Sequence, residues 1–374
     1  MKKFFHYSLK IILILIILAV FFLAAGFFAI RFGWTNVPGG EDINSKIYNS
    51  LARKETVTTW QKIINLPKNL SIFGEHENLN WCRLGVAAKY SPYDAAGMFK
   101  AYRSTQSEEL LIHMLLALQL RKGATSDFAN DLKNCTNELG EWNEKKLESS
   151  LTSTNNLSAY TWQNSEYWSV IKEAIIKDEP VIIKAAQQAG IQPRLLVSVA
   201  IVEQLRLYYT QREFYEKLFK PLKILANANK MAWGVMSIKE AMAIQTENYL
   251  HDNASAFYPG KDYEKLLDYN NNLDIAKERY SRLTNERNHY YSYLYGSLII
   301  KELETQWKKA GYDIKYRPEI VATLFNIGFN HSEPKAEPVV GGSTLDINGE
   351  KYFFGSLAFE FYYSGELAQE FPFK

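Results

Sequence analysis

The sequence predicts a mainly α-helical protein with one short β-hairpin, on two patterns. Apolar residues recur three and four positions apart along much of the 374-residue chain, which is the period of amphipathic helices. Near the C-terminus, Asn348-Gly349 separates two short strand-like runs within residues 343–354, and this dipeptide is typical of a type I′ turn. Since 47% of the residues are apolar, the chain can build a real core, and its length suggests about two domains.

The N-terminus carries a long apolar segment. From Ile11 to Ile30 there is no charged or strongly polar side chain, and a helix of this length matches the roughly 30 Å hydrocarbon core of a bilayer. Basic residues gather before the segment, so its N-terminal end is expected in the cytoplasm. Leu23-Ala24-Ala25-Gly26 is a weak signal-peptide cleavage site as the alternative. We expect residues 1–34 to form a cytoplasmic N-terminus and one transmembrane helix in the inner membrane, with the C-terminal domain in the periplasm.

Charge and cysteine content exclude some classes of protein. The 43 Lys and Arg nearly balance the 41 Asp and Glu, so the chain lacks the basic excess that nucleic-acid binding needs. The six His and two Cys show no metal-ligand spacing and phosphate-binding Gly-rich loops are missing, so neither a metal nor a cofactor is expected. In an exported domain Cys82 and Cys135 could form one disulfide, but two free buried cysteines fit equally well, and both alternatives stay open.

Residues 35–160 are predicted to form a helical N-terminal region and linkers. Residues 35–50 look like a linker, and polar composition between Gly123 and Thr161 suggests a surface helix followed by a second linker. The helices expected from periodicity are Thr58–Ile64, Trp81–Tyr90, Tyr93–Tyr102 and Glu108–Leu120. The role of residues 50–150 is not indicated; docking to protein partners in the cell envelope is one interpretation.

Residues 161–374 are predicted to form a second, helical domain. Pro180 should break or kink the helical stretch Tyr167–Gln188, and Gly190 and Pro193 should end one helix and begin the next. Ser356 is placed to cap a last helix that reaches Tyr363. The remaining helices are expected at Arg194–Tyr209, Ile238–Tyr249, Leu273–Arg282, Tyr290–Ala310 and Pro318–Gly328.

Glu203 is the candidate catalytic residue. It lies three and four residues from Val199, Ala200 and Leu207, on the apolar stripe of its predicted helix. A carboxyl group there must be paired or protonated, because burial of an isolated charge is costly. A protonated buried carboxyl can act as a general acid on a glycosidic bond. Composition alone nevertheless favours a structural role for such a residue.

Three segments that follow one another along the chain favour a catalytic role for Glu203 over a structural one. They are Pro193-Arg194-Leu195-Leu196-Val197-Ser198-Val199-Ala200-Ile201-Val202-Glu203-Gln204, then Gly234-Val235-Met236-Ser237 with Ile238-Lys239-Glu240-Ala241-Met242-Ala243 after it, and Leu324-Phe325-Asn326-Ile327-Gly328. Residues 190–330 therefore resemble the catalytic domain of lytic transglycosylases and goose-type lysozymes. The family has an acid in a Pro-x-Leu-(apolar)-Glu-Ser stretch, a Gly-Leu-Met-Gln turn and an Ala-Tyr-Asn-x-Gly segment. The resemblance implies a lysozyme-like catalytic domain over residues 161–374.

The resemblance also implies roles for individual residues. Glu203 would be general acid and then base. Gly234 would let the backbone approach the sugar, Met236 and Ser237 would line the cleft, and Phe325 and Asn326 would contact or orient the substrate. Three departures weaken polar contacts of the family: Gln204 replaces Ser, Ser237 replaces Gln, and Phe325 replaces Tyr.

Other prominent residues are expected to be structural. Lytic transglycosylases need no second carboxylate, because the substrate's own acetamido group and C6 hydroxyl act as nucleophiles. Glu240, Glu247 and Asp252 are accordingly expected to be solvated, and Glu360 to be a paired buried acid. The tyrosines at 290, 291, 293, 295, 362 and 363 are expected to pack rather than to bind sugar.

The resulting expectation is a membrane-anchored lytic transglycosylase. It would cleave the β-1,4 bond between MurNAc and GlcNAc in peptidoglycan glycan strands and leave 1,6-anhydro ends. A hydrolytic muramidase on the same site is the near alternative. A non-catalytic peptidoglycan-binding or scaffold protein of an envelope complex is the alternative from another class, and the three departures favour it.

Overall fold

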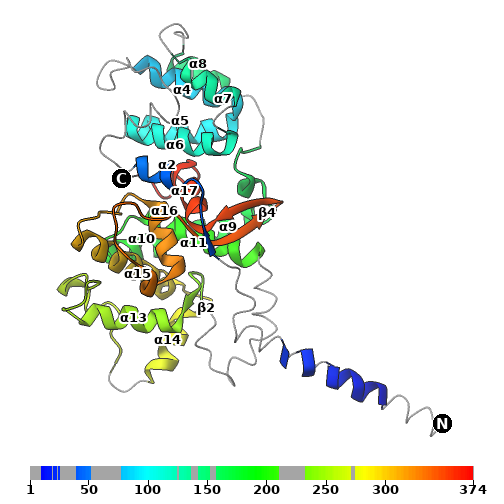
Figure 1. Cartoon of the computed structure of the whole chain (residues 1–374), viewed down its shortest axis with the longest axis vertical. Helices are drawn as coiled ribbons and strands as arrows, with labels where there is room; N and C mark the ends of the chain where they lie inside the picture. Colours follow the sequence, from blue (N-terminus) through cyan, green and yellow to red (C-terminus); the bar gives the residue numbers. More distant parts are fainter. Residues whose placement is uncertain are drawn as a thin grey trace.

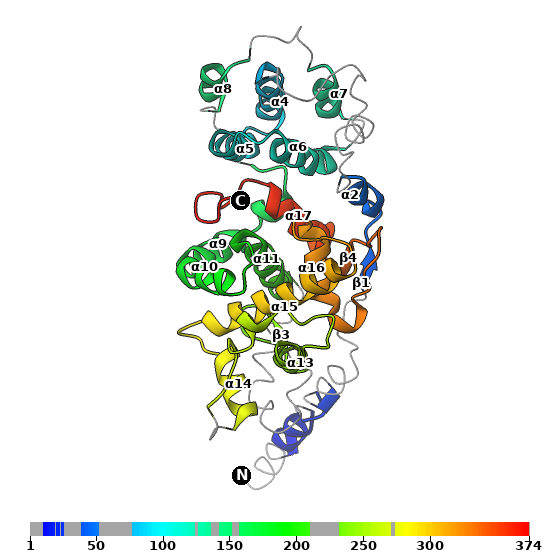
Figure 2. The ribbon, with the colours of Figure 1, turned by 90° about the vertical axis from the view of Figure 1, so that its left-hand side faces the viewer.

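The computed structural model describes residues 10–18, 20–22, 24–25, 39–51, 77–123, 126–135, 142–151, 157–209, 232–270 and 274–373. Over these ranges the chain is mainly helical, with small antiparallel sheets. The helices stack in successive layers along the long axis of the molecule (Figures 1 and 2). The helix predicted at Thr58–Ile64 lies outside the described residues.

The expected fold class included a membrane-spanning helix, and this prediction is wrong. Residues 10–18 and 20–22 are helical. Among the residues that the structure describes, however, no helix is long and apolar enough to cross a membrane.

The upper layers of the molecule are formed by the helices of residues 77–151 (Figure 2). Side chains just before three of these helices cap them: the Ser107 hydroxyl accepts a hydrogen bond from the Leu110 amide, the Ser126 hydroxyl from Ala129, and the Asn143 side chain from Lys146. The helices are α4 (Glu77–Tyr90), α5 (Pro92–Thr105), α6 (Glu108–Lys122), α7 (Asp127–Lys133) and α8 (Glu144–Ser150).

A disulfide joins Cys82 on α4 to Cys135, just after α7, with a Cα–Cα distance of 5.8 Å. The structure thus decides between the two alternatives that the sequence left open. The bond closes a loop of sequence separation 53 and holds α4 against α7.

Helix α11 (Pro193–Tyr209) is the centre of the second helical part. It is buried along most of its length and packs against α9 (Trp168–Lys177), α10 (Glu179–Gln188), α15 (Tyr290–Lys309), α16 (Pro318–Ile327) and α17 (Phe354–Tyr363). Helices α13 (Glu240–His251) and α14 (Ile275–Leu283) lie beyond α15 (Figure 1). The predicted break near Pro180 is confirmed, since α9 ends at Lys177 and α10 begins at Glu179.

The described residues also form two small antiparallel sheets. One has the order β1-β4-β5, with β1 at Gly39–Glu41, β4 at Gly341–Ile347 and β5 at Glu350–Phe353. The predicted hairpin is confirmed: Asn348 and Gly349 both have positive φ, +53° and +85°, as a type I′ turn requires. The other sheet pairs β2 (Ala232–Trp233) with β3 (Ile238–Lys239) around the turn 234–237. The last helix begins at Phe354 and reaches Tyr363, and Ser356 caps it as predicted: it lies in the first turn, and its hydroxyl accepts a hydrogen bond from the Phe353 amide at 3.2 Å.

The predicted linker over residues 35–50 is instead partly structured. Strand β1 pairs with β4, with Gly39 opposite Ser343, and α2 (Ser45–Leu51) follows it. The Ser45 hydroxyl donates to the Val340 carbonyl, and the Asn49 amide to that of Pro338. Residues 39–51 therefore belong to the second helical part, although they precede residues 77–151 in the chain.

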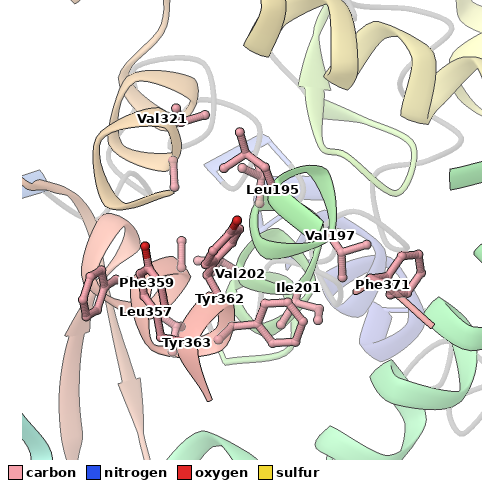
Figure 3. Close-up of a cluster of buried hydrophobic side chains, with 14 of the residues drawn as sticks. Leu195, Val197, Ile201, Val202, Val321, Leu357, Phe359, Tyr362, Tyr363 and Phe371 are labelled. Carbon is pink, nitrogen blue, oxygen red and sulfur yellow. The ribbon is translucent and has the colours of Figure 1, made fainter. Parts of the chain in front are cut away.

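Helices α11, α16 and α17 share one apolar cluster (Figure 3). Its buried members include Leu195 and Val202 of α11, Val321 of α16, and Leu357 and Tyr362 of α17. Inside it Arg194 is fully buried, and burial lowers its pKa to about 10. Its guanidinium donates to the carbonyls of Phe361, Tyr362, Glu366 and Phe371. These bonds fasten the end of α17 and the C-terminal segment to α11.

Arg121 links the two helical parts. It lies on α6 and pairs with Glu350 of β5 and with Glu360 of α17. Its guanidinium also stacks on Tyr352, 4.1 Å from the ring centroid. Glu360 is thus a paired buried acid, as predicted, and also accepts a hydrogen bond from Trp162 Nε1 at 3.2 Å. Burial raises the pKa of Glu360 to about 7, although Arg121 opposes the shift.

Candidate active site around Glu203

Glu203 lies in the C-terminal half of α11, with a side chain only 3% exposed. Its carboxylate is paired with Arg206, one turn further along the helix, whose side chain is 14% exposed. Nε of Arg206 donates to Glu203 Oε2 at 3.0 Å, and Nη2 donates to the same oxygen. The sequence analysis placed Glu203 on the buried stripe correctly, but it did not identify this partner.

The turn between β2 and β3 is fastened to the same end of α11. The residue after Glu203, Gln204, donates from Nε2 to the Val235 carbonyl at 2.5 Å. On the other side of the turn, the Met236 amide donates to the Ser292 hydroxyl of α15 at 3.3 Å. The structure therefore brings together two of the three segments that carry the family resemblance. This hydrogen bond also indicates a role for Gln204, because its side chain is longer than that of the family's Ser and reaches the turn.

Each predicted residue of the turn has a clear position. Gly234 has a φ of +69°, and an added Cβ would collide with the Leu283 carbonyl and come within 2.6 Å of Ser292 Oγ. The glycine is therefore required by local packing, whether or not a sugar approaches it. Met236 is fully buried, and a Cβ on Gly296 of α15 would come within 2.8 Å of its Cε. Its side chain is therefore part of the hydrophobic core. Ser237 is half-buried with a φ of +48°, and its amide closes the turn on the Gly234 carbonyl.

Phe325 and Asn326 occupy the end of α16. Phe325 is buried, at 3% exposure, which gives it a packing role. Asn326 is half-buried, and its Oδ1 accepts hydrogen bonds from the amide and the hydroxyl of Ser343, both at 2.8 Å. Asn326 thus holds β4, a strand that also packs against α11. Strand β4 therefore connects the third segment to the helix of Glu203. None of the contacts described here, however, joins Asn326 to Glu203 directly.

The expectation that Glu240 and Glu247 are solvated is wrong. Glu247 is paired with Arg279, whose Nε and Nη2 lie 2.7 and 2.6 Å from its two oxygens, and it accepts hydrogen bonds from Tyr269 and Tyr295. Burial would raise the pKa of Glu247, but these hydrogen bonds outweigh it and lower the pKa. Glu240 is buried, 3.7 Å from the same guanidinium. Asp252 is exposed, as expected.

Glu302 is a buried acid that the sequence analysis missed. It is fully buried on α15, and neither carboxyl oxygen has a hydrogen-bond partner among the described residues. The nearby Thr246 hydroxyl donates to the Met242 carbonyl instead. Burial raises the pKa of Glu302 well above its ordinary value. The signal was present in the sequence, since Glu302 lies three and four residues from Leu298 and Ile299, on an apolar stripe like that of Glu203.

The tyrosines of α15 are mainly packing residues in the structure. Tyr293 and Tyr295 are buried, at 2% and 0% exposure, while Tyr290 and Tyr291 are half-buried against the core. Near the C-terminus, Tyr362 and Tyr363 are buried as well. No group of three or more His, Cys, Asp and Glu side chains arranged to hold a metal ion occurs in the described ranges.

A cavity of about 370 Å³ lies away from Glu203, between α5, α9 and the C-terminal segment. Part of its polar lining is paired internally. Tyr93 donates to Glu366 at 2.7 Å and Lys172 pairs with the other oxygen of Glu366 at 2.9 Å. We regard it as part of the junction between the two helical parts.

Comparison with models of protein families, with curated proteins and with solved structures returns no match to this chain. The resemblance to lytic transglycosylases therefore rests on the residues of the three segments alone.

Proposed function

We propose that this protein is a peptidoglycan lytic transglycosylase in which Glu203 is the acid and base. The observation that supports this best is the position of Glu203: its buried side chain lies in the C-terminal half of the central helix, and the next residue, Gln204, holds the hairpin turn. The chemistry needs one such carboxyl group, and Arg206 is the residue hydrogen-bonded to it in the described part of the chain.

The proposed reaction has two proton transfers. In the first step Glu203 protonates the oxygen of the β-1,4 bond, the bond from this oxygen to C1 of MurNAc breaks, and the acetamido carbonyl oxygen attacks C1. In the second step the Glu203 carboxylate takes the proton of the C6 hydroxyl, whose oxygen replaces the acetamido oxygen at C1. The product carries a 1,6-anhydro ring, no water is consumed, and the carboxyl group is again protonated.

The other predicted site residues hold the elements of the proposed site in place. Gly234 and Ser237 form the turn, and Asn326 holds β4 beside α11. Met236 and Phe325 stabilise the elements from inside, as their burial indicates. We propose that glycan strands bind where the turn 234–237 meets the end of α11.

The disulfide supports a location outside the cytoplasm. Disulfides persist mainly in oxidising compartments, and Cys82–Cys135 is formed in the structure. We therefore propose the periplasm, where peptidoglycan is found, as the working compartment.

The test is release of soluble muropeptides from purified peptidoglycan by the full chain. We expect Glu203→Gln to reduce the rate at least about 100-fold, because general acid–base catalysis typically contributes that much. The exposed Glu333 provides a matched control, so Glu333→Gln should leave the rate unchanged. Equal rates for wild type and Glu203→Gln would contradict the proposal. Binding to peptidoglycan without any release would favour the non-catalytic scaffold.

A further inference from the structure

Helices α13, α14 and α15 all border the turn between β2 and β3. Helix α13 begins at Glu240, directly after β3. Helix α14 ends at Leu283, and the carbonyl of this residue lies so close to Gly234 that an added Cβ would come within 2.1 Å of it. Helix α15 carries Ser292, whose hydroxyl accepts a hydrogen bond from the Met236 amide at 3.3 Å. The position of the turn therefore depends on how these helices are held together.

A second contact joins α14 to the β2–β3 hairpin. The ring of Trp233 on β2 packs edge-on against the ring of Tyr280 on α14, with the ring centroids 5.2 Å apart. Trp233 is buried, at 2% exposure, and Tyr280 is half-buried. Because the Tyr280 ring and the Leu283 carbonyl both belong to α14, a shift of this helix would displace the start of the turn.

Glu247 is the side chain that joins the three helices. It lies on α13, and its two oxygens accept hydrogen bonds from Nε and Nη2 of Arg279 on α14, at 2.7 and 2.6 Å. Tyr295 on α15 donates to the same carboxylate at 2.5 Å, and Tyr269, from the loop before α14, donates to it at 2.6 Å. The two tyrosine hydroxyl oxygens lie 2.7 Å apart. One carboxylate of α13 thus receives donors from both of the other helices.

The hydrogen bonds of Glu247 are of a strong and directional kind. The side chains of Glu247 and Arg279 are only 15% and 7% exposed, so solvent and salt screen their attraction little. A bidentate arginine–carboxylate pair also fixes the orientation of its two partners, and not only their distance. Glu240, at the first position of α13, lies 3.7 Å from the same guanidinium. Arg279 is therefore held by α13 at two points.

We propose that Glu247 is a positioning residue for glycan binding: by joining α13, α14 and α15, it holds the β2–β3 turn in the orientation that the glycan strand requires. This inference rests on the proposed function. Glu247 acts through Arg279 and α14 on the turn, and not on the reacting atoms. Glu203 lies on α11, which none of these hydrogen bonds involves, so Glu247 should affect binding of the glycan more than the chemical step.

The experiment measures kcat and KM on soluble glycan fragments for the full chain, Glu247→Gln and Tyr269→Phe. Glutamine has nearly the same shape as glutamate, but it lacks the charge and turns an N–H group towards the donors of the cluster. KM of Glu247→Gln should rise about 10-fold or more at nearly constant kcat, because a displacement of about 1 Å in a positioning group can cost a factor of about 100. Tyr269→Phe keeps the ion pair, so its KM should rise less. An unchanged KM in Glu247→Gln would overturn the proposal.

Arg83→Gln is the control for a general loss of stability. Arg83 is buried, with a side chain 4% exposed, and pairs with Glu108 at 2.9 Å among the helices of residues 77–151. The substitution also removes a buried ion pair, but in the other helical part, so KM should stay at the wild-type value. An equal rise of KM in Arg83→Gln and Glu247→Gln would show that any loss of stability raises KM, and it would overturn the proposal.

A second readout does not depend on catalysis. In the full chain labelled with fluorotryptophan, the Trp233 signal in the fluorine NMR spectrum is assigned by its absence from Trp233→Phe. This signal should shift in Glu247→Gln, because the Tyr280 ring moves relative to Trp233, and should stay in place in Arg83→Gln.

The fluorine signal also separates failure of the proposed function from failure of this inference. If the Trp233 signal shifts in Glu247→Gln although the wild type cleaves nothing, the proposed function fails while the control of the turn by Glu247 stands. An unchanged signal overturns that control. Tyr269→Phe, which leaves the ion pair in place, is the second variant if Glu247→Gln does not fold.

Discussion

Three buried glutamates show how differently one residue type is accommodated in this fold. Glu203 shares a cation on its own helix, Glu360 receives one from the other helical part, and Glu302 has none among the described residues. A buried carboxyl group without a partner keeps its proton, because desolvation penalises the charged form. The three residues are therefore expected to respond differently to substitution.

Glu302 should make the protein less stable as pH rises. In the unfolded chain its pKa is near 4.5, while burial raises the pKa in the folded state well above that value. Above about pH 4.5 only the unfolded chain releases the proton, so rising pH favours unfolding until the folded pKa is reached. In Glu302→Gln this effect is absent, and its stability relative to wild type should increase by up to about 1.4 kcal/mol per pH unit.

Urea unfolding between pH 5 and 8 measures this difference. Glu333→Gln, at an exposed position, is the control and should follow the wild-type curve. Parallel curves for wild type and Glu302→Gln would show that Glu302 is ionised, or paired, in the folded protein.

Gly234 should tolerate alanine poorly. The substitution puts a side chain at positive φ, which costs about 1–2 kcal/mol, and its Cβ would collide with the Leu283 carbonyl. Gly349→Ala is the matched control, because Gly349 has a φ of +85° and open space around it. Thermal unfolding should show that Gly234→Ala loses at least about 1 kcal/mol more than Gly349→Ala, as overpacking predicts. Equal losses would mean that the turn moves away from Leu283 without cost.

At the scale of elements, local patterns predicted most helices and the hairpin, while contacts distant in sequence were missed. Helix α11 and the Asn348-Gly349 turn follow from periodicity and turn chemistry within a few residues. Strand β1 was missed because its partner Ser343 lies some 300 residues further along the chain. The Arg206 pair was predictable, since an arginine three residues after a glutamate reaches it on a helix. The partners of Glu247 come from α14, α15 and the loop before α14, and no local pattern indicates them.

The disulfide should contribute strongly to the stability of α4 and α7. In the chain-entropy model, closure of a loop with separation 53 is worth about 4 kcal/mol. We expect a similar loss in Cys82→Ser combined with Cys135→Ser, and a comparable loss on reduction of the wild type. Chemical unfolding with and without reductant measures both. A reductant effect that persists in the double variant would show that the disulfide is not its cause.

At the scale of the whole molecule, the two helical parts are joined by buried polar contacts as well as by apolar packing. Arg121 of α6 reaches Glu350 and Glu360, and α17 packs against α6. The arrangement places the helices of residues 77–151 over the C-terminal end of the chain (Figure 1). The expected transmembrane helix has no counterpart in the described residues.

Arg121 should contribute much more to the stability of the protein than an exposed arginine among the helices of residues 77–151. Arg121→Met leaves Glu360 buried without its cation, which typically costs 3–5 kcal/mol when the carboxyl group is charged. The comparison is Arg103→Met, whose partner Glu144 is 46% exposed and whose loss should stay within about 0.5 kcal/mol. Unfolding at pH 8 measures both variants, because the pKa of Glu360 is about 7 with Arg121 present and the wild-type pair is therefore charged at this pH. Similar small losses in both would show that Arg121 does not hold the two parts together.

The central claim is that Glu203 drives cleavage of peptidoglycan without water. Mass spectrometry of the chain ends released by the full protein tests it most directly. The account predicts 1,6-anhydro ends, one water lighter than reducing ends, and predicts that they disappear in Glu203→Gln. Reducing ends that depend on Glu203 would identify a muramidase instead, and ends that persist in Glu203→Gln, or no ends from the wild type, would contradict the assignment of this residue.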